Sequence, residues 1–402
     1  MSGTAYVAGT YDTKAEELRY VAGLLRAAGL PVVTIDVGTQ SSASDPDYPA
    51  ADIAAFHPDG YGAVFEVGDR GAAVTAMTTA LLAFMASRTD VGGIIGLGGS
   101  GGTAIVTPAM RSLAIGVPKI MVSTMAAGNV SQYVDVHDIT MMFPVTDIAG
   151  LNRLSRVILA NAAHALAGMM LRKPPASTDT RPALGLSMFG VTTPCIQQLT
   201  ARLSPDYECQ VFHANGPGGR SFEAIAAAGL LRGMVDLTTT EAADHLLGGV
   251  CTAGPERFDV VAGTGIPWIG SCGALDMVNF WAPETVPEKY RARLFHAHNA
   301  NVTLMRTTAE ELERIAAWIS AKLNASRGPV RMLLPEGGVS MLDAPGQKFH
   351  DPAARAALFV AFEQNFKVSD THRLIRVPHH INDPAFVEAA EREVRDLFPL
   401  GT

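Results

Sequence analysis

Short apolar segments alternate with longer amphipathic segments along the first half of the chain. Strand-like apolar runs occur at residues 5–8, 31–35, 63–65, 93–97 and 119–123. Between them, helical patterns extend over residues 15–28, 71–86 and 103–113. This alternation is typical of β-α-β units, whose strands form a parallel sheet covered by helices on both faces.

A long helix is expected to close this first domain. Apolar side chains recur at spacings of three and four residues: Ile148, Leu151, Leu154, Ile158, Ala162, Ala165 and Met169. This spacing predicts a helix with one apolar face. Polar residues such as Arg153, Arg156 and His164 interrupt the stretch, so we interpret it as a buried helix and not as a membrane span.

A segment with no hydrophobic period, residues 173–182, separates two regions of strong pattern. It is rich in Pro, Ser and Thr, which is typical of a linker. Strand-like runs then recur at 184–189, 210–213, 234–237, 258–261, 331–334 and 374–377, and helical patterns at 308–323, 351–366 and 383–398. The sequence therefore predicts an α/β fold. We expect two Rossmann-like, doubly wound domains, residues 1–172 and 183–402, with mainly parallel sheets and a ligand cleft between them.

Composition narrows the functional classes. Of the 402 residues, 48% are hydrophobic and 17% are charged, so both domains can bury a core. The formal net charge is -8 and no basic run is present, which argues against nucleic-acid and membrane partners. The first residues lack the features of an export signal, and the four cysteines match no zinc or redox spacing. We expect a cytoplasmic protein with reduced thiols and no bound metal centre.

A glycine-rich loop carries the strongest functional signal. It directly follows the apolar run at 93–97, precedes a helical pattern, and consists of Gly98, Gly99, Ser100, Gly101, Gly102 and Thr103. Glycines let successive backbone N–H groups approach an anion, and the start of the helix adds partial positive charge. The loop has neither the lysine of a P-loop nor the spacing of a dinucleotide fingerprint, so it predicts a phosphate without naming the ligand. A close strand-to-helix turn that binds nothing is the alternative interpretation.

Further polar residues follow the neighbouring predicted strands. They are Thr10, Asp12, Thr13 and Lys14 after the first strand, Asp36 after the second, and Ser123 and Thr124 after the run at 119–123. Because the carboxyl ends of parallel strands share one edge, Lys14 can reach a phosphate held by the glycine loop. Asp12 can order Lys14 or hold a magnesium ion through water, and Asp36 can accept ribose hydroxyls. Each position also suits a plain helix cap or turn.

The second half offers polar residues that suit an enzyme. Asp276 and Asn279 are three residues apart and share one face if their segment is helical. The residues that we expect to act on a substrate are Asp276, His298, Arg306 and Glu336. A histidine paired with a carboxylate can act as a general base, and an arginine can stabilise an oxyanion. Histidines that merely satisfy backbone carbonyls are the alternative.

Seven blocks of sequence, in order, resemble one protein family. They are residues 9–14, the glycine loop, 118–124, 147–152, 273–280, 298–299 and 302–308. The family contains uncharacterised bacterial proteins and the ATP-binding amino-terminal region of the tomato mosaic virus resistance protein. The resemblance implies two Rossmann-like subdomains, dimerisation, and ATP binding through Asp12, Thr13, Lys14 and the glycine loop. The segment 268–272 departs from the family's pattern, which leaves the second-domain ligand open.

Three functional hypotheses follow from these observations. The leading one is a protein that binds ATP or another nucleotide, with Mg2+ as a companion ion. The second is a metabolic enzyme that acts on a small oxygen-rich acid or sugar phosphate through the residues of the second half. The third is an interaction module without catalysis. The plant protein carries a further barrel-like region, which implies a separately encoded phosphoenolpyruvate-hydrolase-like barrel protein as a partner, and the family implies a homodimer.

Overall fold

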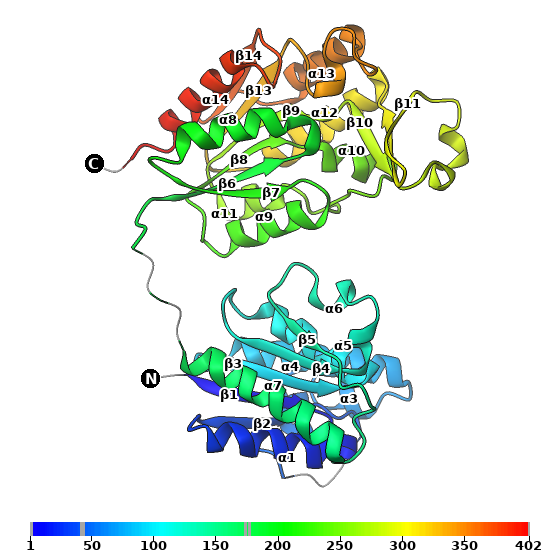
Figure 1. Ribbon diagram of the computed structural model, residues 1–402, viewed down its shortest axis with the longest axis vertical. Helices are drawn as coiled ribbons and strands as arrows, with labels where there is room; N and C mark the ends of the chain where they lie inside the picture. The colour runs from blue at the N-terminus through cyan, green and yellow to red at the C-terminus, as the bar shows by residue number, and fades with distance from the viewer. Residues whose placement is uncertain (1–2, 41–44, 173–174, 176–177, 401–402) are drawn as a thin grey trace. The chain divides into compact units, whose positions relative to one another are not determined.

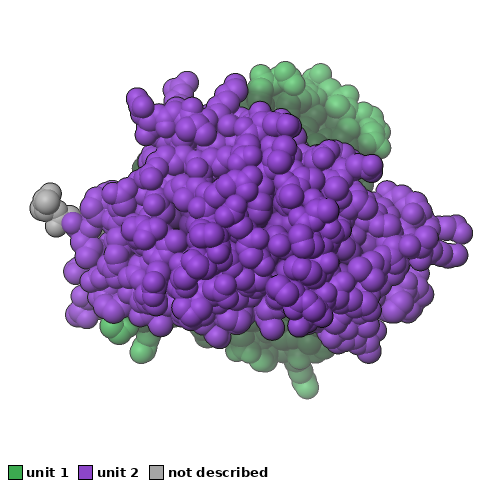
Figure 2. Space-filling model, turned by 90° about the horizontal axis from the view of Figure 1, so that it is seen from above, with its two compact units in different colours: residues 1–176 green, residues 177–402 purple. Residues whose placement is uncertain are grey.

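The computed structural model describes residues 3–40, 45–172, 175 and 178–400. The chain divides into two compact units, Met1–Ala176 and Ser177–Thr402, which are coloured green and purple in Figure 2. Each unit has its own parallel sheet and its own hydrophobic core. The expected linker at 173–182 lies partly outside the described residues.

Unit 1 alternates strands and helices as the sequence predicts (Figure 1). Its elements are β1 (Thr4–Gly9), α1 (Tyr11–Ala27), β2 (Val32–Asp36), α2 (Ala50–Ala54), α3 (Gly62–Phe65), α4 (Arg70–Ala86), β3 (Val91–Gly98), α5 (Ser100–Ser112), β4 (Lys119–Ser123), η1 (Thr124–Ala127), α6 (Ser131–Val134), β5 (Thr140–Met142) and α7 (Arg153–Leu171). The sheet is parallel throughout, in the order β2-β1-β3-β4-β5. All carboxyl ends of its strands therefore meet at one edge.

Helices cover both faces of the unit 1 sheet. On one face, α1 and α7 bury Leu18 and Leu159 against Val7 and Ile95. On the other face, α4 and α5 contribute residues such as Met77 to a separate apolar cluster. The sheet order reverses direction at β1, because β2 pairs on one side of β1 and β3 on the other. Ligands of open parallel sheets bind beside such a switch point.

Two sequence expectations for unit 1 were wrong in detail. Residues 63–65 form the short helix α3 and not a strand, because β1 pairs directly with β2 and β3 and leaves no place between them. The long helix α7 begins at Arg153, where Asn152 accepts N–H bonds in a capping box. Its buried face is also displaced from the expected one, since Leu154 and Met169 are exposed.

The helix α7 is long and apolar enough to cross a membrane by length and composition alone. In the structure, Ala162, Ala163 and Leu166 are buried in the cluster that includes sheet residues such as Ile120. This packing is that of a core helix in a soluble α/β protein.

Unit 2 repeats the same architecture with a larger sheet. Its elements are β6 (Ala183–Met188), η2 (Gly190–Thr192), α8 (Thr193–Leu203), β7 (Glu208–His213), α9 (Pro217–Ala227), β8 (Gly233–Thr238), α10 (Thr240–Leu247), α11 (Asp259–Thr264), β9 (Trp268–Gly273), β10 (Met277–Phe280), η3 (Pro283–Thr285), η4 (Glu288–Tyr290), β11 (Phe295–Asn299), β12 (Val302–Arg306), α12 (Ala309–Leu323), β13 (Val330–Pro335), η5 (Met341–Asp343), α13 (Pro352–Asn365), β14 (His372–Val377) and α14 (Pro384–Leu397).

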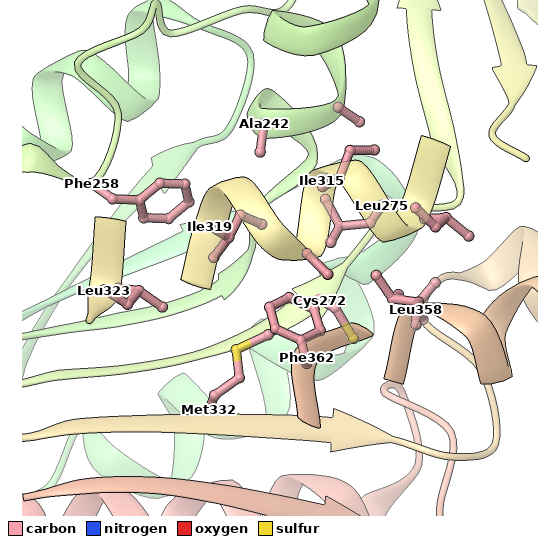
Figure 3. Packing of buried hydrophobic residues seen from close by; sticks show 14 of the residues in the cluster. Ala242, Phe258, Cys272, Leu275, Ile315, Ile319, Leu323, Met332, Leu358 and Phe362 are labelled. Atoms are coloured by element: carbon pink, nitrogen blue, oxygen red, sulfur yellow. The ribbon is translucent and has the colours of Figure 1, made fainter. Parts of the chain in front are cut away.

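The main sheet of unit 2 is parallel, in the order β14-β13-β9-β8-β6-β7, so its switch point lies at β6. One face packs on α8 and α14. On the other face, Ile315 and Ile319 of α12 pack with Leu358 and Phe362 of α13, as Figure 3 shows. The two units thus share a three-layer, doubly wound arrangement, which confirms the expected fold class.

A small antiparallel sheet, β10-β12-β11, was not expected from the sequence. Met277–Phe280 is its strand β10, so Asp276 and Asn279 do not share a helix face. The apolar run 258–261 was also assigned wrongly, because Asp259–Thr264 is helix α11 and Phe258 has a left-handed φ of 76°. A strand that the sequence reading missed, β9, lies immediately after it.

Candidate functional site

A pocket of about 350 Å³ lies at the carboxyl edge of the unit 1 sheet, beside its switch point. The loop and helix start after β1 contribute Thr10, Asp12, Thr13 and Lys14, and the start of α5 contributes Gly99, Ser100, Gly101 and Gly102. The remaining wall is formed by Thr39, Gln40, Arg70, Val74 and Ile105. The structure therefore brings Lys14 and the glycine loop together, as the shared edge of the strands requires.

The start of α5 presents backbone donors to this pocket. The first helical hydrogen bond runs from Thr103 N–H to the Gly99 carbonyl, at 3.0 Å. The N–H groups of Ser100, Gly101 and Gly102 precede that bond, and no acceptor for them occurs among the described residues. Such donors at a helix start attract anions because they carry the positive end of the helix dipole.

The structure requires glycine at one position of the loop and not at another. A Cβ on Gly98 would lie 2.9 Å from backbone atoms of Gly102 and Thr103, so the close approach of β3 to α5 requires glycine there. A Cβ on Gly101 would meet nothing nearer than Arg70 Nη2, at 4.0 Å. Packing therefore does not demand glycine at position 101, and its absent side chain keeps the pocket open.

Charged side chains of both signs line the pocket. The Lys14 ammonium donates to the Ile148 carbonyl at 3.0 Å, which fixes its position and leaves further N–H donors. Arg70 is the first residue of α4, where Asp69 caps the helix by accepting from Ala72 N–H. Within the described ranges, neither the Arg70 guanidinium nor the Asp12 carboxylate has a hydrogen-bond or ion-pair partner.

Asp36 has a structural place that the sequence did not reveal. It is buried, and its Oδ1 accepts from Tyr11 N–H at 3.0 Å and from Gly38 N–H at 2.8 Å. The carboxylate thus joins the loops that follow β1 and β2. It does not line the pocket, so the geometry does not favour the expected contact with a ribose.

Three expected hydroxyl ligands also lie outside the pocket wall. The Thr103 hydroxyl is buried and contacts the Gly99 carbonyl and the Ser123 hydroxyl, at 2.7 and 2.6 Å. Ser123 is buried as well and caps η1 by accepting from Met125 N–H. Thr124 lies beside Gly99 without lining the pocket. These hydroxyl groups hold the glycine loop in place.

Arg70, Thr39 and Gln40 are pocket residues that the sequence reasoning missed. Thr39 and Gln40 follow β2, so the shared carboxyl edge could have indicated them. Arg70 follows the short helix α3 and not a strand. Its signal was the sequence Asp69-Arg70-Gly71 at the start of a helical pattern, which places an arginine at a capped helix start.

The expected catalytic set of unit 2 does not form one site. Asp276 is buried, its Oδ2 accepts from the Ser340 hydroxyl at 2.7 Å, and its Oδ1 has no hydrogen-bond partner among the described residues. Burial raises the pKa of Asp276 to about 7, although nearby Arg306 favours the charged carboxylate. Arg306 is itself buried and donates to carbonyl groups of Phe349 and Thr307. Asp276 and Arg306 therefore belong to the interior of unit 2.

The other two members of that set lie elsewhere in unit 2. Glu336 forms an ion pair with Arg376 at 2.8 Å, where both side chains are partly exposed. His298 lines a different, small pocket together with residues of β12. No contact joins His298 or Glu336 to Asp276 in the part of the chain that the structure describes. Across the same residues, no three His, Cys, Asp or Glu side chains gather as a metal site requires.

Models of one protein family match both units. The amino-terminal domain of the uncharacterised protein family UPF0261 matches residues 3–175, and its carboxyl-terminal domain matches residues 181–398. The chain belongs to this family. The two matched regions correspond to the two compact units.

Relatives of the UPF0261 chain occur in bacteria and in a plant. A UPF0261 protein of Rhizobium meliloti (strain 1021) is 55% identical over 392 residues, which cover 98% of each chain. The ToMV resistance protein Tm-1(GCR237) of Solanum lycopersicum is 38% identical over 423 residues, covering 99% of this chain and 56% of the tomato protein. The relation to the tomato protein is thereby confirmed, and this chain spans little more than half of its length.

A solved glycosyltransferase, SsfS6 of Streptomyces sp. SF2575 in complex with thymidine diphosphate, also matches the chain. It shares 14% identity over 67% of this chain and 81% of that chain, with a TM-score of 0.19. A score this low carries no argument about function.

Proposed function

We propose that this UPF0261 protein binds a nucleotide, ATP in the first place, in the pocket at the carboxyl edge of unit 1. The observation that carries the proposal is the set of backbone donors at Ser100, Gly101 and Gly102, which have no acceptor among the described residues. An anion with several oxygen atoms satisfies such donors, and phosphate is the anion that helix starts most often bind.

Two cations support a ligand with more than one phosphate. Lys14 lines the pocket from α1, and Arg70 lines it from the start of α4. A lysine offers a point charge, whereas an arginine offers a planar fork that matches two phosphate oxygens. Asp12 has no partner among the described residues and is suited to hold through water a magnesium ion that accompanies the phosphates.

The rest of the wall suits a nucleoside. Val74 and Ile105 provide apolar surface, and Thr39 and Gln40 provide hydrogen-bonding groups. The pocket volume of about 350 Å³ is at the lower end of the range for small-molecule sites. A nucleotide would fill a pocket of this size. The resemblance of residues 9–14 and of the glycine loop to an ATP-binding family favours ATP over other phosphate-bearing ligands.

Calorimetric titration of the full chain tests this proposal. ATP should bind saturably, and Lys14→Ala should weaken binding by about tenfold or more, the loss typical of one charge-assisted hydrogen bond. Lys367→Ala is the matched control, because that lysine is exposed in unit 2 and does not line the unit 1 pocket. The proposal fails if ATP does not bind while a sugar phosphate such as glucose 6-phosphate does, or if Lys14→Ala binds ATP like the parent chain.

Other expectations for this UPF0261 chain stay predictions. They are the homodimer, the separately encoded barrel partner, the companion magnesium ion and the cytoplasmic location. Gel filtration with light scattering measures the first, and addition of Mg2+ during the ATP titration measures the third.

A further inference from the structure

A second pocket lies at the switch point of the unit 2 sheet. Phe189 and Val191 directly follow β6, the strand at which the sheet order reverses, and His213 ends the neighbouring strand β7. These residues line a pocket of about 90 Å³. Parallel sheets bind ligands at the carboxyl ends of strands beside this point. The position after β6 in unit 2 corresponds to the position after β1 in unit 1.

The small antiparallel sheet provides the opposite wall of this pocket. His298 comes from β11, and Val302 and Leu304 come from β12. Leu304 packs in one cluster with Val191 and Ala274, so the small sheet lies against the carboxyl edge of the parallel sheet (Figure 1). The pocket is therefore bounded by the segment that follows β6, by the end of β7 and by two strands of the small sheet.

Among the described residues that line the pocket, the polar side chains are the imidazoles of His213 and His298. The His213 ring stacks on Phe189, with ring centroids 5.2 Å apart and an angle of 26° between the planes. Throughout the described part of the chain, no side-chain hydrogen bond involves a ring nitrogen of His213 or His298. Partial burial lowers the pKa of His213, so near neutral pH this ring has one N–H donor and one acceptor.

We propose that this pocket binds a small, largely apolar carboxylic acid, with its carboxylate at His213 and His298 and its hydrocarbon part against Val302 and Leu304. An imidazole N–H gives a carboxylate a charge-assisted hydrogen bond. The described residues of the wall include no carboxylate that could hold a cationic ligand. Its few donors and its small volume do not suit a nucleotide. This proposal concerns a different unit from the nucleotide pocket and does not depend on it.

Nuclear magnetic resonance of the histidine rings in the full chain tests the proposal. Isobutyrate and benzoate are the probes, and their uncharged amides, isobutyramide and benzamide, are the comparison ligands. We expect saturable shifts of the His213 and His298 ring resonances with the acids and at least tenfold weaker binding of the amides. His164, which is exposed on α7 of unit 1, is the internal reference and should not shift.

Three variants complete the test. His213→Ala and His298→Ala should each weaken binding of the acid about tenfold, the usual loss of one charge-assisted hydrogen bond. Gly190 lines the pocket and a Cβ on it meets no atom within 4 Å, so Gly190→Val should narrow the pocket without a clash that destabilises unit 2. The proposal is overturned if neither acid shifts both rings at about 10 mM, ten times a millimolar dissociation constant. It is also overturned if His164 shifts equally or if Gly190→Val binds the acid like the parent chain.

Discussion

The carboxyl edges of the two parallel sheets differ in what satisfies their backbone donors. In unit 1, the first N–H groups of α5 have no acceptor among the described residues and open into a pocket. In unit 2, the N–H groups of Gly216 and Gly219, at the start of α9, donate to the Glu241 carboxylate at 2.7 and 3.0 Å. The protein's own carboxylate thus occupies in unit 2 the kind of place that a ligand anion would occupy in unit 1.

A buried ion network holds this carboxylate at the start of α9. Arg257 donates to Glu241, Glu223 and Asp236 at 2.9, 2.8 and 2.7 Å, and all four side chains are largely buried. Thr239 and Thr240, which follow β8, are also fully buried. The strand order is alike in both units, so the difference between the two helix starts comes from the side chains around them. A binding site therefore has to be argued from side chains and not from the fold.

The largest expected effect comes from removing the arginine at the centre of this ion network. Arg257→Met leaves three carboxylates buried with no counter-charge and should lower the free energy of unfolding of unit 2 by about 3–5 kcal/mol. All three tryptophans of the chain, Trp268, Trp281 and Trp318, belong to unit 2, so their fluorescence during urea unfolding reports this unit. ATP binding by unit 1 should remain unchanged.

An exposed arginine gives the matched control for this change. Arg376 pairs with Glu336 and Glu363 where the side chains are partly exposed, so Arg376→Met should cost at most about 1 kcal/mol. Equal losses in the two variants would contradict the importance of burial for the network.

A second, smaller effect depends on pH. The pKa of buried Asp276 is raised from 3.8 to about 7, so between these values the folded state binds more protons than the unfolded state. The free energy of unfolding should therefore fall as pH rises from about 4 to about 7, with at most about 4 kcal/mol from this group. Asp276→Asn should remove that part of the slope in the tryptophan-monitored unfolding of unit 2. Identical slopes in both chains would refute the shift.

A pair of glycine substitutions separates packing from binding in unit 1. Gly98→Ala forces a Cβ to within 2.9 Å of the α5 backbone and should destabilise the unit by about 1–3 kcal/mol. Gly101→Ala has no such clash and should stabilise the helix by about 0.5 kcal/mol, yet weaken ATP binding because the Cβ enters the pocket. Hydrogen exchange of residues 91–112 measures the stability, and calorimetry measures the affinity. If both variants are less stable than the parent chain but bind ATP with the same affinity, the loop is only a structural turn.

The alternating pattern of apolar runs was enough to predict the three-layer fold. The pattern failed where the apolar runs were short. Residues 63–65 form a helix, because β1 pairs directly with β3 and leaves no place for a strand between them. Most of the run 258–261 also lies in a helix and not in a strand, and Phe258, directly before that helix, takes a left-handed conformation. Periodicity over three or four residues cannot separate a buried helical turn from a strand. The edge of the unit 1 sheet could be predicted because every parallel strand ends there, and so Lys14 and the glycine loop meet.

Sequence position alone could not decide which polar residues face the ligand. Asp36 and Ser123 end strands as expected, but each turns inward to backbone N–H groups. Arg70 reaches the pocket from a helix after an irregular segment, where no strand pattern indicates the shared edge. In unit 2, the residues that we expected to be catalytic lie far apart in the sequence. Only the fold shows that Asp276 is buried in the interior and that His298 is not.

The smallest expected effect concerns the residue that the sequence did not indicate. Arg70→Ala should weaken ATP binding about tenfold and affect AMP less, because a free guanidinium on the pocket wall can contact the outer phosphates. Arg153→Ala is a close control, since Arg153 also begins a helix, is exposed, and does not line this pocket. Arg70→Lys keeps the charge without the fork and should fall between the two. If Arg70→Ala and Arg153→Ala weaken binding equally, the effect is general electrostatics, and the open edge of unit 1 then recognises its ligand through the backbone donors and Lys14 alone.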